Sequence, residues 1–514
     1  MFHNGTQIKG VIASAPAIVI LVALFPATIG FSQAPNKLTL PTKVVIENVV
    51  AAENPQQSYA LYLPSTYVPE KSSPILIALD PGARGKTPVE HFKDAAEQYG
   101  WIVVGSNQSR NGSLERTVDS VNAIWRDLHQ RFSIDDGRVY FAGFSGGARA
   151  AAAIALRCDC AAGVIGAGAG FPIGVAPSAA VHFAHFAFVG IDDFNFPEVN
   201  ALEESLAKAG VNHELKVFAG RHEWPPVDAA TEAIEWMELQ AMRSGIRARD
   251  DKLITLLWEK QSAEAQRLEG AGQLYDAYQV YASMARAFKS LRDVAKAERQ
   301  AASFAAKPAV KDALRNQTRE IKKQRDLENR IYGLLRAQDG GASLSDDDTL
   351  SRSGGSGAAD PRGNASNDRG GLDNDLKTTS ASGNLRSIFS DLRKDANSPG
   401  DTSERRVARR VTSGLYVGFI ERGINQLETQ KHYAVAARLF ELATEVSPER
   451  AGAFYYLAVA YASNSEKKKS LAALKTALEK GFTDVETIKN NPAFESLRNE
   501  PAYQEVINKA APRS

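Results

Sequence analysis

The sequence predicts an α/β domain built on a parallel sheet, followed by an all-α region. Short apolar runs alternate with amphipathic stretches over residues 59–242, which is the pattern of strands and helices in turn. From residue 243 onward the composition changes to one that favours long helices. The length of 514 residues fits more than one unit, because folded domains average about 150 residues.

Composition and charge exclude several classes of protein. The chain is 44% hydrophobic and 24% charged, values that exclude a wholly disordered or fibrous protein. It carries 61 Lys and Arg against 60 Asp and Glu, for a net charge of +1. Dedicated nucleic-acid binders usually carry a large positive excess, so we expect no nucleic-acid partner.

The N-terminus has the features of a targeting segment. An apolar run over residues 11–31 follows a lysine and is interrupted by two prolines, and Ser32-Gln33-Ala34 offers a signal-peptidase site. We therefore expect residues 1–34 to be a cleaved signal peptide and the protein to be exported, to a periplasm or outside the cell. The alternative is an uncleaved membrane anchor, since the run approaches the length of a membrane span.

Residues 59–242 contain the predicted strands and helices of the sheet domain. Continuous apolar runs without a polar face are typical of parallel strands buried on both sides. The predicted strands are 75–79, 102–104, 139–142, 186–189 and 215–218. Residues 118–132 and 148–156 are predicted helices between them.

Two regions follow the sheet domain. Residues 243–337 are rich in Ala, Glu, Lys, Arg and Leu, with Pro308 as their one proline, so we expect long helices there. Residues 338–400 are dominated by Gly, Ser, Asp and Asn, and no aromatic residue occurs between Tyr332 and Phe389. With so little to bury, this stretch is predicted to be a flexible, disordered linker.

The strongest chemical motif is Gly143-Phe144-Ser145-Gly146-Gly147. It directly follows the predicted strand 139–142 and opens the predicted helix, which is the context of a nucleophile elbow. The glycines allow the tight turn that lifts the Ser145 hydroxyl clear of the backbone, and the helix N-terminus can stabilise a developing oxyanion. The alternative is an ordinary glycine-rich turn, because Gly-x-Ser-x-Gly also occurs by chance.

A serine nucleophile needs a base, and the base needs an acid to orient it. His222 follows the predicted strand 215–218, and Asp192 and Asp193 follow the strand 186–189, so serine, acid and histidine come in the order of a hydrolase triad. We predict His222 as the base. The spacing from Gly190 favours Asp193 as the acid, with Asp192 as the alternative or as a residue that holds the loop.

The second oxyanion donor is expected in the loop after the strand 75–79. Asp80-Pro81-Gly82-Ala83-Arg84 follows that strand, and we assign the backbone N–H of Ala83, paired with that of Gly146. Arg84 could meet an acidic substrate. A plain Pro-Gly turn is the alternative interpretation.

On these residues, 59–242 resembles the α/β-hydrolase family. The run from Gly143 to Arg149 and the late His222 resemble most the secreted polyhydroxybutyrate depolymerase, feruloyl esterase and dienelactone hydrolase group. The resemblance implies hydrolysis of a carboxylic ester through an acyl-enzyme, without cofactor or metal. The chain departs from this group in having Asp80-Pro81 where a His-Gly oxyanion motif is usual. Four aromatic residues could form a substrate wall or simply belong to the core: Phe144, Phe194, Phe196 and Trp224.

Residues 401–514 resemble tetratricopeptide repeats. In a 34-residue frame, small and large residues recur at the positions where paired helices cross. The matching residues are Ala436, Phe440, Ala443, Pro448, Phe454, Leu457, Ala458, Tyr461, Ser470, Leu474 and Ala477. The alternative is a generic antiparallel helix pair. Stacked helix pairs expose one face, which could hold a protein partner.

Two other functions remain open from the sequence. A serine peptidase would use the same triad on amides, and a protein-binding scaffold would use the repeats while its hydrolase domain is inactive.

Cys158 and Cys160 lie one residue apart at the end of the helix after Ser145. They are either packed thiols or a local disulfide, because a metal site would need further ligands nearby.

Overall fold

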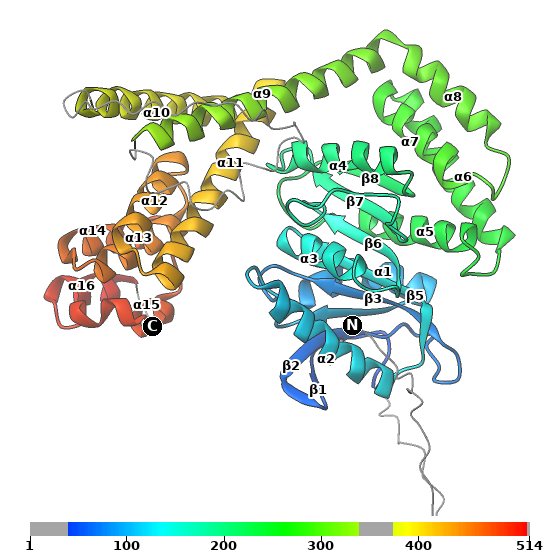
Figure 1. Cartoon of the computed structure of the whole chain (residues 1–514), viewed down its shortest axis with the longest axis horizontal. Coiled ribbons are helices and arrows are strands. Elements are labelled where there is room, and N and C mark those ends of the chain that lie inside the picture. Colours follow the sequence, from blue (N-terminus) through cyan, green and yellow to red (C-terminus); the bar gives the residue numbers. More distant parts are fainter. Residues whose placement is uncertain (1–39, 339–373, 511–514) are drawn as a thin grey trace, which may run out of the picture. The chain divides into compact units, whose positions relative to one another are not determined.

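The computed structural model describes residues 40–338 and 374–510. The predicted signal peptide, 1–34, and residues 339–373 of the predicted linker lie outside the described residues. The chain divides into two compact units. The first is Met1–Val164 with Val181–Phe183, and the second is Ile165–Ala180 with Ala184–Ser514. Figure 1 shows the order of the elements along the chain.

Within the described residues, eight strands form one sheet in the order β1-β2-β4-β3-β5-β6-β7-β8. Their bounds are β1 (Val45–Ala51), β2 (Asn54–Tyr62), β3 (Ser73–Leu79), β4 (Ile102–Ser106), β5 (Ile134–Phe144), β6 (Ala161–Ala167), β7 (Ala184–Gly190) and β8 (His213–Phe218). The predicted α/β fold class is confirmed, and so are all five predicted strands. The sheet begins before residue 59, because β1 and β2 form an antiparallel pair from residue 45.

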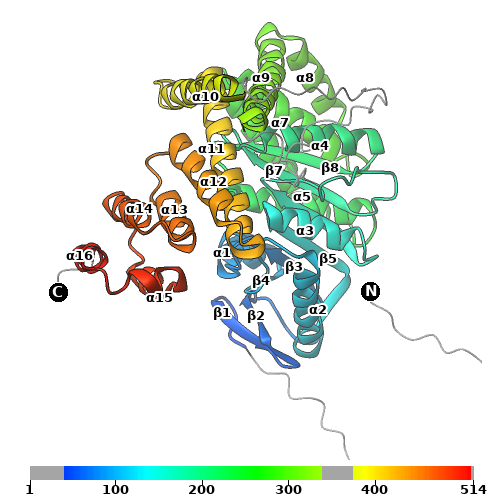
Figure 2. The same ribbon diagram turned by 60° about the vertical axis from the view of Figure 1, so that its left-hand side comes forward.

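In the first unit the centre of the sheet is covered on both sides. β3 pairs in parallel with β4 and with β5, and every residue of β3 and β4 is buried. Helix α1 (Lys86–Tyr99) packs against β4, while α2 (Leu114–Arg131) and α3 (Gly146–Ala155) contact each other. Figure 2 shows α1 and α2 on opposite faces of the sheet. Double-sided burial explains why these strands are continuous apolar runs.

In the second unit, β7 and β8 pair in parallel, and all seven residues of β7 are buried. Helix α4 (Phe196–Ala209) packs on both strands, and α5 (Val227–Arg243) packs on β7. The loop that joins β7 to α4 and the loop that follows β8 both lie in this unit. They carry the predicted acid and the predicted base.

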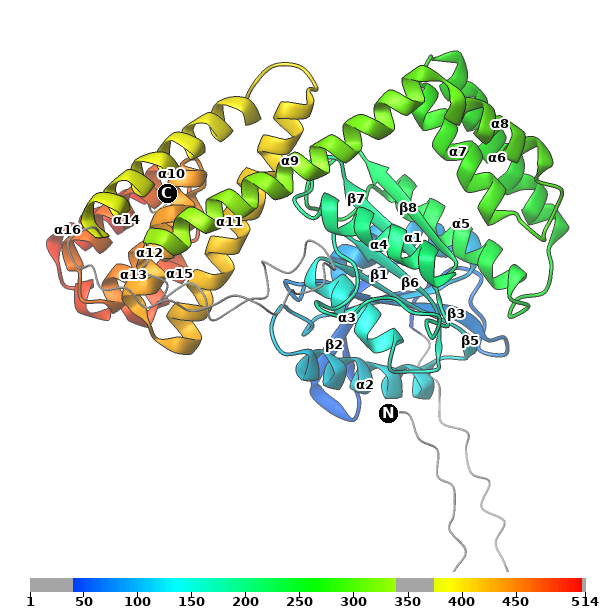
Figure 3. The same cartoon turned by 45° about the horizontal axis from the view of Figure 1, so that its top comes forward.

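The region 243–337 is helical, as predicted. It forms α6 (Asp251–Gly270), α7 (Leu274–Ala287), α8 (Ala295–Ala306) and α9 (Pro308–Gln338). Consecutive helices pack on each other, and Figure 3 shows α6, α7 and α8 beside one end of the 31-residue helix α9. Pro308 stands at the first position of α9, where its missing N–H leaves no hydrogen bond unmade.

The predicted flexible linker is wrong over its second half. Residues 374–396 form helix α10 (Asn374–Ala396), which packs on α9 and α11. Leu385, Phe389 and Leu392 are buried in a core shared with Ile331 of α9. Their spacing of four and three residues places them on one helical face, and the partly buried Ile388 and Ala396 pack against the same core, so this apolar face docks the helix.

The remaining helices follow one another as an array that Figure 2 shows side-on. They are α11 (Ser403–Ile424), α12 (Tyr433–Val446), α13 (Ala451–Ser463), α14 (Lys467–Glu479), α15 (Val485–Asn490) and α16 (Pro501–Ala510). Most residues that the repeat frame selects are buried between these helices, including Ala436, Ala458 and Leu474. The helices are therefore confirmed, while the tetratricopeptide resemblance stays a prediction. No described helix is long and apolar enough to cross a membrane.

Candidate active site

Ser145 lies in a strained turn between a strand and a helix. β5 ends at Phe144 and α3 begins at Gly146, and Ser145 between them has φ 53° and ψ −120°. A positive φ is unusual for a residue with a side chain and is retained where a site requires it. A Cβ atom on Gly143 would collide with the backbone of Gly147, and one on Gly147 would collide with the carbonyl of Leu79. The two glycines are thus required by the turn.

Asn111 lies beside the start of α3, which sequence reasoning missed. A Cβ atom on Gly146 would collide with the Asn111 side-chain amide, and the Asn111 N–H donates to the carbonyl of Pro81 at 2.9 Å. Asn111 thereby links the loop after β3 to the start of the helix. No motif in the sequence marks this residue, because its role depends on the approach of two separate loops.

The loop after β3 is organised by Asp80, which is fully buried. Its carboxylate accepts hydrogen bonds from the Gly82 N–H at 2.8 Å and from Arg84 at 2.9 and 3.0 Å. Arg84, which the sequence suggested for an acidic substrate, thus pairs with Asp80 of its own loop.

Ala83 has a φ of 59°, and its N–H donates to the carbonyl of Asp80 at 3.1 Å. An oxyanion would have to share that N–H with the turn. The oxyanion roles of Ala83 and Gly146 stay predictions.

Asp193 and His222 are in direct contact within the second unit. The His222 Nδ1 lies 2.9 Å from Oδ1 and 3.0 Å from Oδ2 of Asp193. The Asp193 side chain is fully buried and also accepts the Asn195 N–H at 2.8 Å. Burial raises the pKa of Asp193, and its hydrogen bond with His222 opposes that rise. With Nδ1 donating to the carboxylate, Nε2 is the ring nitrogen that can accept a proton.

Asp192 lies apart from this pair. Its Oδ2 accepts a hydrogen bond from Arg409 of α11 at 2.8 Å, and its N–H donates to the carbonyl of Gly220 at 2.9 Å. Of the two adjacent carboxylates, the structure therefore brings Asp193 to the imidazole. Asp192 instead ties its loop to a distant helix.

Gly168 and Phe194 lie directly beside the Asp193–His222 pair. Gly168 has φ +63°, and a Cβ atom there would lie 3.0 Å from Asp193 Oδ2 and 3.0 Å from His222 Nδ1. The partly buried ring of Phe194 packs on the imidazole, with 4.1 Å between the ring centroids. Of the other aromatic wall candidates, Phe196 belongs to the core beside β7, and Phe144 and Trp224 are buried.

Residues of α9 and α11 also reach this loop, and no signal in the sequence marks them. Arg410 Nε donates to the carbonyl of Ile191 at 2.7 Å, and Gln324 Nε2 donates to the carbonyl of Phe194 at 2.8 Å. Arg410 and Gln324 are fully buried. They lie 219 and 130 residues from their partners in sequence, beyond the reach of any local pattern.

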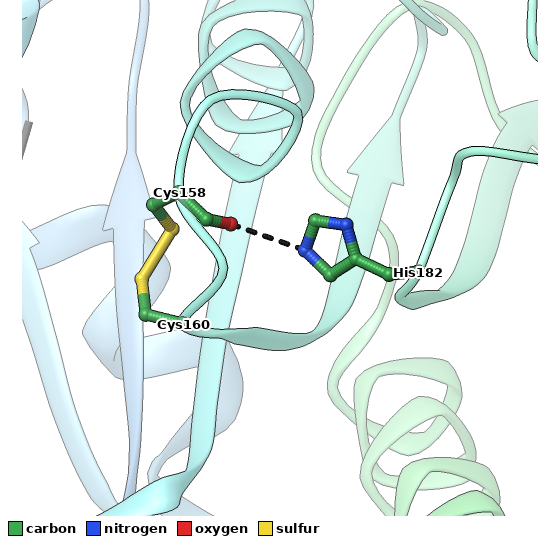
Figure 4. The surroundings of a disulfide bond; sticks show 3 residues. All are labelled: Cys158, Cys160 and His182. Atoms are coloured by element: carbon green, nitrogen blue, oxygen red, sulfur yellow. Dashed lines mark hydrogen bonds between the residues drawn. A yellow bond between two sulfur atoms is a disulfide. The ribbon is translucent and has the colours of Figure 1, made fainter.

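The cysteines form a local disulfide between Cys158 and Cys160, with 5.2 Å between the Cα atoms. Figure 4 shows His182 beside it, and the His182 Nε2–H donates to the carbonyl of Cys158 at 3.1 Å. Among the described residues, no group of three His, Cys, Asp or Glu could hold a metal ion. The predicted absence of a cofactor stays a prediction.

Comparison with known proteins gives structural similarities alone. No protein-family model matches the chain, and no curated protein matches its sequence. A S-formylglutathione hydrolase from Staphylococcus aureus is 17% identical, with 38% of this chain and 96% of that chain covered and a TM-score of 0.31. A ferulic acid esterase is 16% identical, with 38% and 97% covered and a TM-score of 0.32.

A third similar structure is esterase 2 of Thermogutta terrifontis, phosphonylated by sarin. It is 15% identical, with 40% of this chain and 96% of that chain covered and a TM-score of 0.32. Such TM-scores are too low to support an argument about activity. The function proposed below therefore rests on the residues of this chain.

Proposed function

We propose that this protein is a serine hydrolase that cleaves carboxylic esters through an acyl-enzyme. Ser145 is the nucleophile, His222 the general base and Asp193 the residue that orients the base. The observation that carries the proposal is the buried Asp193 carboxylate bonded to Nδ1 of His222. The Ser145 turn, with its positive φ between β5 and α3, supports it independently.

In the proposed reaction, Ser145 Oγ attacks the ester carbonyl while its proton passes to Nε2 of His222. The negative charge then rests on the former carbonyl oxygen, where the Gly146 N–H at the start of α3, together with the Ala83 N–H, stabilises it. Collapse of this intermediate breaks the bond to the alcohol oxygen, which takes the proton from His222. Water then repeats the sequence on the acyl-enzyme, releases the acid and restores the serine.

Asp193 has two parts in this scheme. It keeps the proton of the neutral imidazole on Nδ1, so that Nε2 faces the reaction, and its negative charge stabilises the imidazolium that forms. Full burial strengthens the second effect, because a charge interacts more strongly where water is excluded. The Asn195 N–H holds the carboxylate by a hydrogen bond, and the backbone at Gly168 lies close beside it.

We further propose that the protein is exported and that its helical array binds a protein partner. The apolar run over residues 11–31 and the Ser32-Gln33-Ala34 site support export. The Cys158–Cys160 disulfide fits an oxidising compartment. A membrane is a partner only if the N-terminal segment stays uncleaved. The stacked helices α11–α14 support the proposal of a partner site.

The experiment is covalent labelling of the full chain by a fluorophosphonate probe, combined with hydrolysis of a panel of substrates. The panel holds short-chain, aromatic and polymeric esters, each with its amide counterpart. We expect labelling at Ser145 and turnover of esters, both absent in Ser145→Ala. Turnover of amides alone would favour a peptidase. An unlabelled and inactive wild-type chain would favour a scaffold whose function lies in the helices.

A further inference from the structure

Helices α9 and α11 hold the loop that carries Asp193. This loop, Gly190–Asn195, joins β7 to α4, and both helices belong to the same compact unit. Four contacts hold this loop. Three are hydrogen bonds from the side chains of Arg410, Arg409 and Gln324, and the fourth is the close packing of Gly414 against Phe194. The four contacts reach three residues of the loop, Ile191, Asp192 and Phe194, so the loop is held at several points.

Arg410 makes a fully buried contact with this loop. Its side chain is fully buried, its Nε donates to the Ile191 carbonyl at 2.7 Å, and its guanidinium lies 3.8 Å from the ring centroid of Phe196. Glu320 of α9 provides the counter-charge, with Oε2 3.3 Å from Arg410 Nη1. Burial lowers the pKa of Arg410 to about 10, so the side chain stays charged at neutral pH.

Burying a charged guanidinium is costly, and an apolar side chain of similar volume would pack α11 onto α4 more favourably. What an apolar side chain could not do is bond the Ile191 carbonyl. Arg410 therefore adds control of the loop backbone to the packing of the helices. The fixed carbonyl belongs to a residue two positions before Asp193.

The other contacts complete this control on both sides of Asp193. Arg409 binds the Asp192 carboxylate at 2.8 Å, and Gln324 binds the Phe194 carbonyl at 2.8 Å. A Cβ atom on Gly414 of α11 would lie 3.0 Å from the Phe194 Cβ. Both residues that flank Asp193 are thus held by helices from beyond residue 308.

We propose that Arg409 and Arg410 are positioning residues for Asp193, and that α9 and α11 thereby complete the hydrolytic site. The proposal rests on the triad proposed above. A catalytic acid has to be held to within a fraction of an ångström, and a shift of about 1 Å can lower the rate a hundredfold. The helical region is on this account a part of the enzyme, in addition to any partner that it binds.

The test uses full-length variants: Arg410→Met, Arg410→Lys, Arg409→Gln and Asp192→Asn, with the double variant of the last two. Lys323→Gln is the matched control, because Lys323 of α9 joins the same two helices through Glu404 of α11, at 3.4 Å, in a pair that does not include Glu320. For each variant we measure kcat, KM and the rate of fluorophosphonate labelling. Nuclear magnetic resonance of histidine-labelled protein follows the His222 Nδ1 proton, whose downfield resonance reports its bond to Asp193.

For Arg410→Met we expect kcat to fall about tenfold or more with KM within about twofold of wild type, because acid orientation acts mainly on the chemical step. The Nδ1 resonance should broaden or disappear. The kcat of Arg410→Lys should lie between those of wild type and Arg410→Met, since lysine keeps the charge but lacks the planar guanidinium group. Lys323→Gln should keep the kcat and the His222 resonance of wild type.

In the partly buried Arg409–Asp192 pair, Arg409→Gln and Asp192→Asn should each lower kcat about threefold, and the double variant should be no worse than the poorer single variant. This cycle decides the proposal even if Arg410→Met fails to fold. If Arg409→Gln and Asp192→Asn both keep the kcat and the His222 Nδ1 resonance of wild type, the positioning proposal is wrong. A wild-type chain that shows the His222 Nδ1 resonance but is not labelled by the fluorophosphonate would refute Ser145 as the nucleophile. The positioning proposal would then be decided by whether the variants lose that resonance.

Discussion

Gly168 stands so close to Asp193 that a Cβ atom at residue 168 would lie 3.0 Å from the carboxylate oxygen Oδ2. The same atom would lie 3.0 Å from Cε1 and from Nδ1 of His222. The backbone just after β6 therefore lies directly beside the pair, and a side chain at residue 168 would fit only if Asp193 or His222 shifted. The backbone reaches this position with a φ of +63°, which only glycine adopts without strain.

We predict that Gly168→Ala lowers kcat about tenfold or more, because the added methyl group separates the imidazole from the carboxylate. Gly174→Ala is the matched control, since Gly174 has a φ of +80° but open space around its Cβ position. Both variants bear the strain of a positive φ, about 1 kcal/mol in stability. Steady-state kinetics on one soluble ester separates the two effects. Equal kcat values in both variants would show that the contact has no part in the reaction.

Asp193→Asn should lower kcat far more than Asp192→Asn. The amide keeps the shape of the side chain but loses the charge that stabilises the imidazolium, and loss of a triad acid can cost about 10⁴-fold. Asp192 contacts Arg409 in place of His222, so its amide should cost only the support of the loop. The two variants are compared at one pH on one ester. A larger loss in Asp192→Asn would move the acid to residue 192.

The free energy of unfolding should depend on pH partly through the buried His185. This residue of β7 is 1% exposed, neither ring nitrogen has a hydrogen-bond partner among the described residues, and burial lowers its pKa from 6.5 to about 3. Between these two pH values the unfolded chain binds a proton that the folded chain does not. The contribution of neutral His185 is therefore fully present above pH 6.5 and is lost as the pH falls.

In wild type this single group should lower the free energy of unfolding by up to about 1.4 kcal/mol for each pH unit below its unfolded value. His185→Leu removes the titration, so its free energy of unfolding should fall less steeply from pH 6.5 to about 4. Urea unfolding followed by tryptophan fluorescence measures both slopes. Identical slopes would mean that the imidazole is accessible to protons in the folded state.

Helix α10 should be a stable element in solution. Phe389 is 1% exposed in its core, and truncating a buried phenylalanine costs about 3–5 kcal/mol. Hydrogen exchange of peptides from residues 385–396 should be slow in wild type and fast in Phe389→Ala. Ser387→Ala, at an exposed position of the same helix, should leave exchange unchanged. If residues 385–396 of wild type exchange completely at the earliest time point, α10 is not stable and this stretch is a flexible linker, as the sequence predicted.

The sequence predicted those parts of the fold that local patterns encode. The five apolar runs became strands because double-sided burial demands continuous apolar residues. β6 was missed because its sequence, rich in Ala and Gly, lacks the branched and aromatic residues that mark a strand. α10 was missed because Gly and Ser dominate the preceding stretch and conceal three well-spaced apolar residues.

The candidate site shows the same division between local and distant information. Ser145 and its glycines lie within one pentapeptide, and Asp193 and His222 each follow a strand end, so simple rules of order locate them. Arg409, Arg410 and Gln324 follow no such rule. A buried arginine and an exposed one can have similar local sequences, and only the tertiary packing distinguishes them.

The separation of 219 residues between Ile191 and Arg410 also sets an order of events during synthesis. A ribosome adds residues from the N-terminus, so the sheet and all three proposed catalytic side chains leave the exit tunnel long before α11 does. Until then the Ile191 carbonyl lacks its donor and the Asp192 carboxylate lacks its cation. A nascent or prematurely terminated chain would thus carry an acid loop without these supports, and on the positioning proposal its full hydrolytic rate would arrive only with the last quarter of the polypeptide.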